Sequence, residues 1–148
     1  MVKAIRFYEF GGPEVLKFED IDVGDPAPGE VLIRHNAIGF NFLDALMRAG
    51  KYPVLPDLPA IPGAEGAGVI EAVGKNVKNL TVGQRVVYAA TTPGAYAEAR
   101  IMNAHSVVAL PDAISQEDAA ASFLKGMTVE YLIKRCYPVS RGETALVH

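Results

Sequence analysis

The fold is decided by the stretch Pro62-Gly63-Ala64-Glu65-Gly66-Ala67-Gly68-Val69-Ile70. A dinucleotide phosphate loop needs a strand before its glycines and a helix after them. Here a loop with four prolines, residues 51–63, precedes the glycines, and a β-like run, residues 68–74, follows them. We therefore interpret the glycines as positions where the backbone passes close to a neighbour or forms a bulge. A phosphate site is the weaker interpretation.

Short runs rich in β-branched and aromatic residues flank this stretch on both sides. Gly- and Pro-containing turns separate them, because these residues set the backbone angles that turns require. The predicted strands are residues 2–10, 16–23, 31–39, 68–74, 84–90, 95–101 and 106–111. Seven short strands predict a mainly β domain.

Helical signals occur in two places. Residues 41–50 begin at Asn41, a good N-cap, and end at Gly50, which suits the C′ position. Residues 116–137 contain no proline and one glycine. We predict two helices there, broken or bent near Lys125-Gly126.

The C-terminal end has the order helix, turn, strand, with residues 143–148 predicted to begin the strand. This order is the opening of an α/β unit. We therefore expect the chain to be cut from a longer protein. In the alternative, these residues add an edge strand to the same domain.

Composition excludes several classes of protein. The chain has 148 residues, with 14 Lys plus Arg and 17 Asp plus Glu, so its net charge is −3. Without a basic excess, nucleic acid is not an expected partner. No apolar run approaches the ~18 residues that a membrane span needs, so we expect no membrane insertion. The single cysteine, Cys136, fits a reducing compartment and hence the cytoplasm.

Chemistry-bearing residues form no recognisable catalytic or metal motif. The three histidines have no close pair and Cys136 is alone, so no zinc site has its ligands and we expect no metal. Two acids have unusual contexts. Asp44 lies in the first turn of a predicted helix, and Glu65 lies among glycines, where a buried carboxylate could accept hydrogen bonds that order the turn. We assign both to structure.

Seven motifs together resemble a known family. They are residues 11–16 (GGPEVL), 37–44 (AIGFNFLD), 48–53 (RAGKYP), 62–70 (PGAEGAGVI), 82–86 (VGQRV), 94–98 (GAYAE) and 119–128 (AAASFLKGMT). In order and spacing, they resemble the quinone oxidoreductases of the zinc-free medium-chain dehydrogenase/reductase superfamily, the group that includes zeta-crystallin. The resemblance covers the entire chain.

The resemblance implies a mainly β fold with short helices, a GroES-like, partly open β-barrel, cut before the Rossmann domain. Residues 1–137 would form this substrate-side domain. Residues 138–148 would start the first strand of an NADPH-binding Rossmann domain that the chain lacks. We therefore expect this chain alone to be inactive and to bind NADPH weakly or not at all.

The resemblance also implies catalysis without zinc. Zinc-dependent relatives place a Cys where Asn41 stands and a His where Ala64 stands. Without a metal, hydride transfer would depend on placing the nicotinamide against a readily reduced acceptor. Leu46 and Ala64 replace more polar residues of some relatives, which makes the cleft less polar.

The implied site residues fall into two groups. Asn41 and Tyr52 would be catalytic, and Asn41, Phe42, Lys125, Thr128 and Tyr131 would contact NADPH. Three of them have an ordinary alternative: an N-cap for Asn41, a surface loop aromatic for Tyr52, and core packing for Tyr131. Because one side chain cannot easily do both, we favour the cleft role for Asn41.

Three functions stay open, and the first is favoured. The chain is the substrate-side domain of an NADPH-dependent quinone oxidoreductase, or of a zinc-free enone or enoyl (2-alkenal) reductase, or a non-catalytic GroES-like binding module. The expected partner is a small quinone or unsaturated carbonyl compound. The resemblance implies a homodimeric parent protein.

Overall fold

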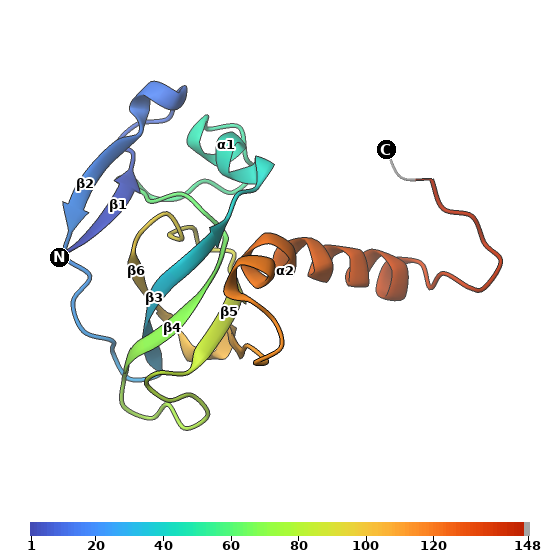
Figure 1. The fold of residues 1–148 in the computed structure, drawn as a ribbon. Helices are drawn as coiled ribbons and strands as arrows, with labels where there is room; N and C mark the ends of the chain where they lie inside the picture. Colours follow the sequence, from blue (N-terminus) through green and yellow to red (C-terminus); the bar gives the residue numbers. More distant parts are fainter. Residues whose placement is uncertain (147–148) are drawn as a thin grey trace.

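The computed structural model describes residues 1–146 and contains seven strands (Figure 1). Their bounds are β1 (Val2–Arg6), β2 (Lys17–Ile21), β3 (Glu30–Gly39), β4 (Glu65–Val73), β5 (Arg85–Ala89), β6 (Ala99–Asn103) and β7 (Val107–Ala109). All seven predicted strands are present, most of them shorter than predicted. In the described residues, no helix has the length and apolar character needed to cross a membrane.

The strands form two antiparallel sheets. β1 pairs with β2, and the larger sheet has the order β6-β3-β4-β5-β7. Two isolated bridges, Ala4 with Ala97 and Phe7 with Ala60, join β1 to the rest of the domain. The larger sheet remains open between β6 and β7 in the described chain. The prediction of a mainly β, partly open barrel is confirmed.

Close packing of β3 against β4 explains the glycines of the opening stretch. At Gly68, a Cβ atom would collide with the backbone carbonyl of Arg34 on β3. The register also shifts between His35 and Ala37, so β3 carries a bulge opposite this glycine. Both predicted reasons for the glycines are confirmed. β4, however, begins at Glu65 and not at Gly68 as predicted, because Glu65 already pairs with Gly39.

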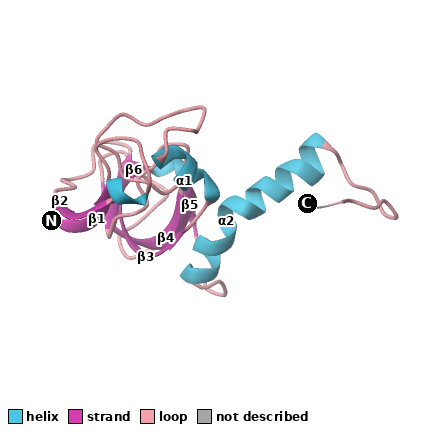
Figure 2. Ribbon diagram, turned by 90° about the horizontal axis from the view of Figure 1, so that it is seen from above, coloured by secondary structure: helices cyan, strands magenta, loops and turns pink. Residues whose placement is uncertain are grey.

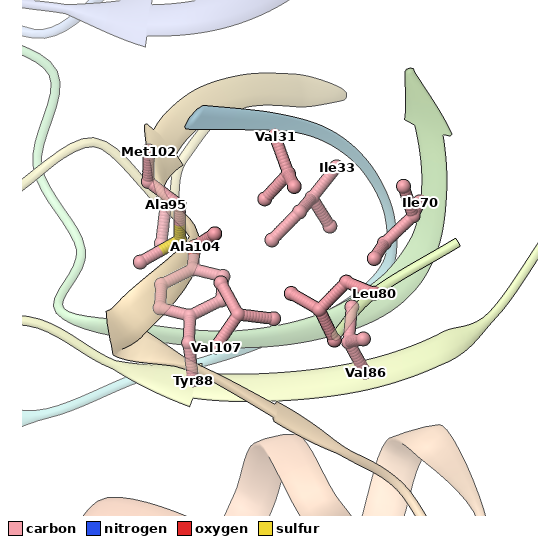
Figure 3. Close-up of a cluster of buried hydrophobic side chains, with 10 residues drawn as sticks. All are labelled: Val31, Ile33, Ile70, Leu80, Val86, Tyr88, Ala95, Met102, Ala104 and Val107. Atoms are coloured by element: carbon pink, nitrogen blue, oxygen red, sulfur yellow. The ribbon is translucent and has the colours of Figure 1, made fainter. Parts of the chain in front are cut away.

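The main core lies inside the curved sheet, and Figure 3 shows side chains from several strands converging there. Tyr88 is the largest fully buried side chain of this cluster. The members are Val31, Ile33, Ile70, Leu80, Val86, Tyr88, Ala95, Met102, Ala104 and Val107. Burial of these apolar groups supplies the main driving force for folding.

Two α-helices complete the fold, α1 (Phe42–Arg48) and α2 (Gln116–Glu130), together with two short 3-10 turns, η1 (Pro13–Val15) and η2 (Ala104–Ser106). α2 continues directly into a π-helical segment, η3 (Tyr131–Cys136). The predicted break near Lys125-Gly126 is therefore wrong. A glycine costs a helix about 1 kcal/mol relative to alanine, which continuous intrahelical hydrogen bonding can outweigh.

Only the first part of α2 packs on the sheet. Ala119 and Ala120 are buried against Ala67 and Val87, and α2 has no buried residue after them. The rest of the helix projects away from the barrel (Figures 1 and 2). This leaves a row of apolar side chains exposed, namely Met127, Val129, Tyr131, Leu132 and Ile133.

Two predicted segments differ from the structure. β6 starts at Ala99 and not at residue 95, because residues 95–98 bond elsewhere: Tyr96 donates to the Pro62 carbonyl, and Glu98 donates to that of Lys3. Residues 143–146 form no strand. Instead, the Glu143 carboxylate accepts from the Ser140 N–H and the Tyr137 hydroxyl, which closes a local turn. Residues 147–148 of the predicted strand lie outside the described residues.

Candidate functional site

Three elements that are distant in sequence meet at one polar cluster. β3 leads into the start of α1 (Figure 1), the first residue of β4 lies beside it, and the middle of α2 covers both. The cluster consists of Asn41, Glu65 and Lys125. The Asn41 Nδ2 atom lies 2.8 Å from Glu65 Oε1, and the Lys125 Nζ atom lies 3.1 Å from both Glu65 Oε1 and Asn41 Oδ1.

Asn41 uses its backbone and its side chain for different sets of partners. As the N-cap residue, it uses its backbone: its carbonyl accepts from the Asp44 N–H, and its N–H donates to the Asp44 carboxylate at 3.0 Å. Its side-chain amide bonds instead to Glu65 and Lys125. The side chain itself therefore does not serve both purposes, as expected, because the Asp44 carboxylate and the Asn41 backbone make the cap.

Glu65 is fully buried, with 0% of its surface exposed. One carboxylate oxygen accepts from Asn41 and Lys125, and the other accepts from the backbone N–H of Leu124 at 2.7 Å. A buried carboxylate needs such partners, since an unpaired charge in the protein interior is very costly. The prediction that Glu65 is a buried acceptor is confirmed, but the groups that its carboxylate binds are the start of α1 and the middle of α2.

Asp44 forms a second buried acid next to this cluster, with 3% of its surface exposed. Burial raises its pKa above the ordinary value, while hydrogen bonds from the Asn41 N–H and the Tyr96 hydroxyl oppose that shift. Burial and the nearby Asp44 carboxylate in turn raise the pKa of Tyr96. The Tyr96 hydroxyl therefore stays protonated and donates to Asp44 at 3.0 Å. The structural role predicted for Asp44 is confirmed.

The remaining predicted site residues are more dispersed. Tyr52 is half-buried in the loop between α1 and β4, and Phe42, the first residue of α1, is 74% exposed. On α2, Thr128 donates to the Leu124 carbonyl, and Tyr131 is exposed at the start of η3. In the described residues, hydrogen bonds join Asn41 to Lys125 but join neither residue to Tyr52 or Tyr131. The predicted role of each residue stays a prediction.

A further polar pair inside the barrel had no signal in the sequence. The His35 Nδ1 atom lies 2.6 Å from the Ala97 carbonyl oxygen, and its Nε2 atom lies 2.8 Å from the Tyr88 hydroxyl. These partners fit a neutral ring that donates from Nδ1 and accepts at Nε2. Burial, and to a smaller extent the Arg100 charge, lower the pKa of His35 to about 4. His35 is one of nine residues in a predicted strand, residues 31–39, and has no distinctive spacing.

The site can supply hydrogen-bond donors to a ligand. In the described part of the chain, no group of three His, Cys, Asp or Glu side chains is arranged to hold a metal ion. Both Glu65 oxygens are occupied by N–H donors, and its neighbours are an amide and an ammonium group. This donor set does not fit zinc, which binds thiolate, imidazole or free carboxylate ligands. It fits an electron-rich oxygen atom.

The antiparallel open barrel, with its capped helix and buried glutamate at one edge, defines a GroES-like domain. The chain belongs to the alcohol dehydrogenase GroES-like domain family, whose model matches residues 27–112.

The whole chain is similar to one part of several longer proteins. It is 47% identical over 148 residues to a quinone oxidoreductase of Pseudomonas aeruginosa and 39% identical over 152 residues to a 2-haloacrylate reductase of a Burkholderia species. A solved structure of Escherichia coli quinone oxidoreductase complexed with NADPH is also similar, with 45% identity and a TM-score of 0.91. The match covers 95% of the present chain and 43% of the E. coli chain. The chain spans 45% and 46% of the length of the two curated relatives.

Proposed function

We propose that this chain forms the acceptor-side domain of an NADPH-dependent quinone oxidoreductase. The observation that carries the proposal is the meeting of Asn41 and Lys125 over the buried Glu65 carboxylate. It brings together an amide and an ammonium group on side chains that are half-buried and exposed, respectively, and can therefore meet a ligand. The similarity to quinone oxidoreductases extends over all 148 residues and supports the same assignment.

The proposed reaction uses no zinc. At the edge of the sheet the chain has Asn41 and Ala64, and both oxygens of Glu65 already accept N–H donors, three in all. The polarising charge is therefore the Lys125 ammonium group. The same set of side chains would have to break its hydrogen bonds to ligate a cation.

NADPH, when bound, supplies the hydride. The described residues contain no strand, glycine loop and helix in the order that binds a pyrophosphate, since the glycines of residues 63–68 follow a loop and lead into β4. Phe42, Thr128 and Tyr131 are exposed and are suited to the nicotinamide end of the cofactor. This chain therefore provides one wall of the cofactor site. Its side chains suit the nicotinamide end of NADPH and not the pyrophosphate.

The exposed half of α2 is consistent with a second domain. Met127, Val129 and Leu132 are each about half exposed, and a covering layer would remove their apolar surface from water. Relatives of more than twice this length have room for such a layer. We place the complete enzyme in the cytoplasm as a homodimer.

A second candidate function is reduction of an activated carbon–carbon double bond. One relative at 39% identity is a 2-haloacrylate reductase. Such a reaction needs a proton for the second carbon, and Tyr52, half-buried in the loop after α1, is the candidate donor.

A comparison of two acceptors separates the two functions. The full natural gene product that carries this chain is incubated with NADPH and either 1,4-naphthoquinone or a 2-alkenal, and NADPH oxidation is followed by absorbance. We expect faster turnover with the quinone. Faster turnover with the alkenal would refute the first proposal, and calorimetry showing micromolar NADPH binding to residues 1–148 would refute the assignment of the pyrophosphate site to another domain.

A further inference from the structure

We infer that Lys125 and Asn41 form a two-donor site for the carbonyl oxygen of the acceptor, and that Glu65 is the positioning residue that holds both donors. This inference rests on the proposed function, because it assumes that the acceptor is a carbonyl compound. It assigns the ammonium group of Lys125 to the acceptor, whereas the family resemblance points it toward the cofactor.

The hydrogen-bond partners determine which donors remain free. The Asn41 amide must point its NH₂ group at the Glu65 carboxylate and its oxygen at the Lys125 ammonium, since the reverse orientation would pair like groups. This uses one of the two Nδ2 hydrogens of Asn41 and two of the three Nζ hydrogens of Lys125. One N–H on each residue is left over, and the two nitrogen atoms are joined through the same amide and carboxylate.

The Glu65 carboxylate and the Lys125 ammonium group differ in their exposure to solvent. Glu65 is fully buried, whereas the Lys125 side chain is 53% exposed. The free N–H of Lys125 can therefore reach a ligand, while the carboxylate below it cannot. The long lysine side chain would otherwise sample many rotamers, and its two bonds to Glu65 and Asn41 restrict it to one region.

The position of Glu65 is itself fixed by packing. A Cβ atom on Gly39 would collide with the Glu65 side chain and with the Ala120 carbonyl, so β3, β4 and α2 approach one another closely at this point. The Leu124 N–H holds the second carboxylate oxygen. Glu65 consequently has no other rotamer available without breaking these contacts, and a rigid second layer of this kind keeps reactive groups in place.

The chemistry needs such a site. During quinone reduction, the acceptor gains a hydride from the reduced nicotinamide, which carries two electrons and one proton, and one further proton from water. The nicotinamide is oxidised, and the quinone becomes a hydroquinone. Negative charge develops on the carbonyl oxygen before that second proton arrives, and donors already aimed at this oxygen stabilise it. Lys125 acts on this oxygen by its positive charge and its N–H group.

A phenolate probe tests the site without cofactor. The phenolate oxygen of 4-nitrophenol resembles the charged oxygen of the half-reduced acceptor, and its absorbance distinguishes phenolate from phenol. We expect the chain to bind the phenolate more tightly than the phenol. Lys125→Met should weaken phenolate binding by about tenfold or more, the value of one hydrogen bond to a charged group. The matched control is Lys134→Met, because Lys134 is an exposed lysine further along the same helix, and it should bind like the wild type.

Glu65→Gln tests the positioning role, with Glu65→Asp as the conservative variant. We expect Glu65→Gln to weaken phenolate binding and to shift the ¹⁵N–¹H side-chain signals of Asn41, and Glu65→Asp to recover part of both. If Glu65→Gln fails to fold, the Asn41 signals and phenolate binding of Lys125→Met still decide the result. Equal phenolate binding by the wild type and Lys125→Met, including no binding by either, overturns the inference.

The two proposals fail in different experiments. If the full gene product reduces no quinone but the chain still prefers phenolate through Lys125, the proposed function fails and the two-donor site stands. If it reduces quinones and Lys125→Met leaves kcat unchanged, the two-donor site fails and the function stands.

Discussion

Acid should weaken this fold through one partly buried histidine, and His35→Gln should remove that sensitivity. His35 joins the Tyr88 hydroxyl to the Ala97 carbonyl and fits this place only as a neutral ring. Its pKa is about 4 in the folded chain, mainly because burial disfavours the charged form, against an ordinary value of 6.5. The folded state therefore binds the proton less readily than the unfolded state.

The size and direction of the effect follow from these two values. His35 contributes stability that is fully present above pH 6.5, falls as the pH drops below 6.5, and is lost once the pH is below about 4. A pKa difference of about 2.5 corresponds to about 3 kcal/mol in the free energy of unfolding. At pH 5 the loss is already about 2 kcal/mol, which lowers the Tm of a chain of this size by roughly 4–8 °C.

Urea unfolding followed by circular dichroism at several pH values between 7.5 and 4.5 measures the effect. Carboxylates also titrate at the lower end, so the informative quantity is the difference in unfolding free energy between wild type and His35→Gln. We expect this difference to shrink by about 2 kcal/mol between pH 7.5 and pH 5, because only the wild type loses the histidine contribution. His105→Gln is the control, since His105 is exposed and its side chain makes no recorded hydrogen bond in the described chain.

The reasoning would be refuted if the unfolding free energies of wild type and His35→Gln changed in parallel with pH. If wild type and His35→Gln lose the same free energy between pH 7.5 and pH 5, His35 is not held neutral by burial. If His105→Gln flattens the curve as much as His35→Gln does, the sensitivity belongs to histidines in general and not to the buried pair.

Four substitutions test other parts of the fold, each measured by the midpoint of thermal or urea unfolding. Gly68→Ala should destabilise the chain by about 2–3 kcal/mol, because its Cβ would collide with the backbone of β3. A Cβ atom at Gly126 meets nothing within 4 Å, so Gly126→Ala should stabilise the chain by up to about 1 kcal/mol. Equal effects of the two substitutions would contradict the packing argument. Tyr96→Phe removes a donor to the buried Asp44 carboxylate and should cost about 1.5–3 kcal/mol, and a neutral result would show that this bond is replaced by water. Ser115→Ala removes the N-cap of α2 and should cost about 1 kcal/mol, and no change would place little of the stability in that helix end.

The sequence predicted the fold well where a local signal existed. Strand periodicity located the cores of all seven strands, and the capping signal located the start of α1 at Asn41. It failed where partners distant in sequence decide. Residues 95–98 alternate like a strand, but they pair with Lys3 and Pro62, so β6 begins four residues later than predicted. The break predicted at Gly126 rested on propensity, which neighbouring hydrogen bonds outweighed.

The site was only partly predictable for the same reason. Asn41 and Lys125 were proposed separately, from a family resemblance, and nothing in their spacing of 84 residues indicates a direct hydrogen bond. Glu65 had the context of a buried acceptor, but its three donors come from the start of α1 and from α2, 24 to 60 residues away in the sequence. His35 had no signal at all, because its partners Tyr88 and Ala97 are 53 and 62 residues away.

Stability of the barrel and geometry of the proposed site depend on one short segment. Ala97 accepts from His35 inside the barrel, and the adjacent Tyr96 donates to Asp44, which in turn accepts from the backbone N–H of Asn41. Each link is a hydrogen bond to a buried or half-buried group, so loosening one removes support from the next. Tyr96→Phe should therefore weaken phenolate binding as well as stability, although the Tyr96 hydroxyl bonds to Asp44 and not to Lys125 or Glu65. A loss of stability with unchanged phenolate binding would show that the start of α1 is held by Asp44 alone.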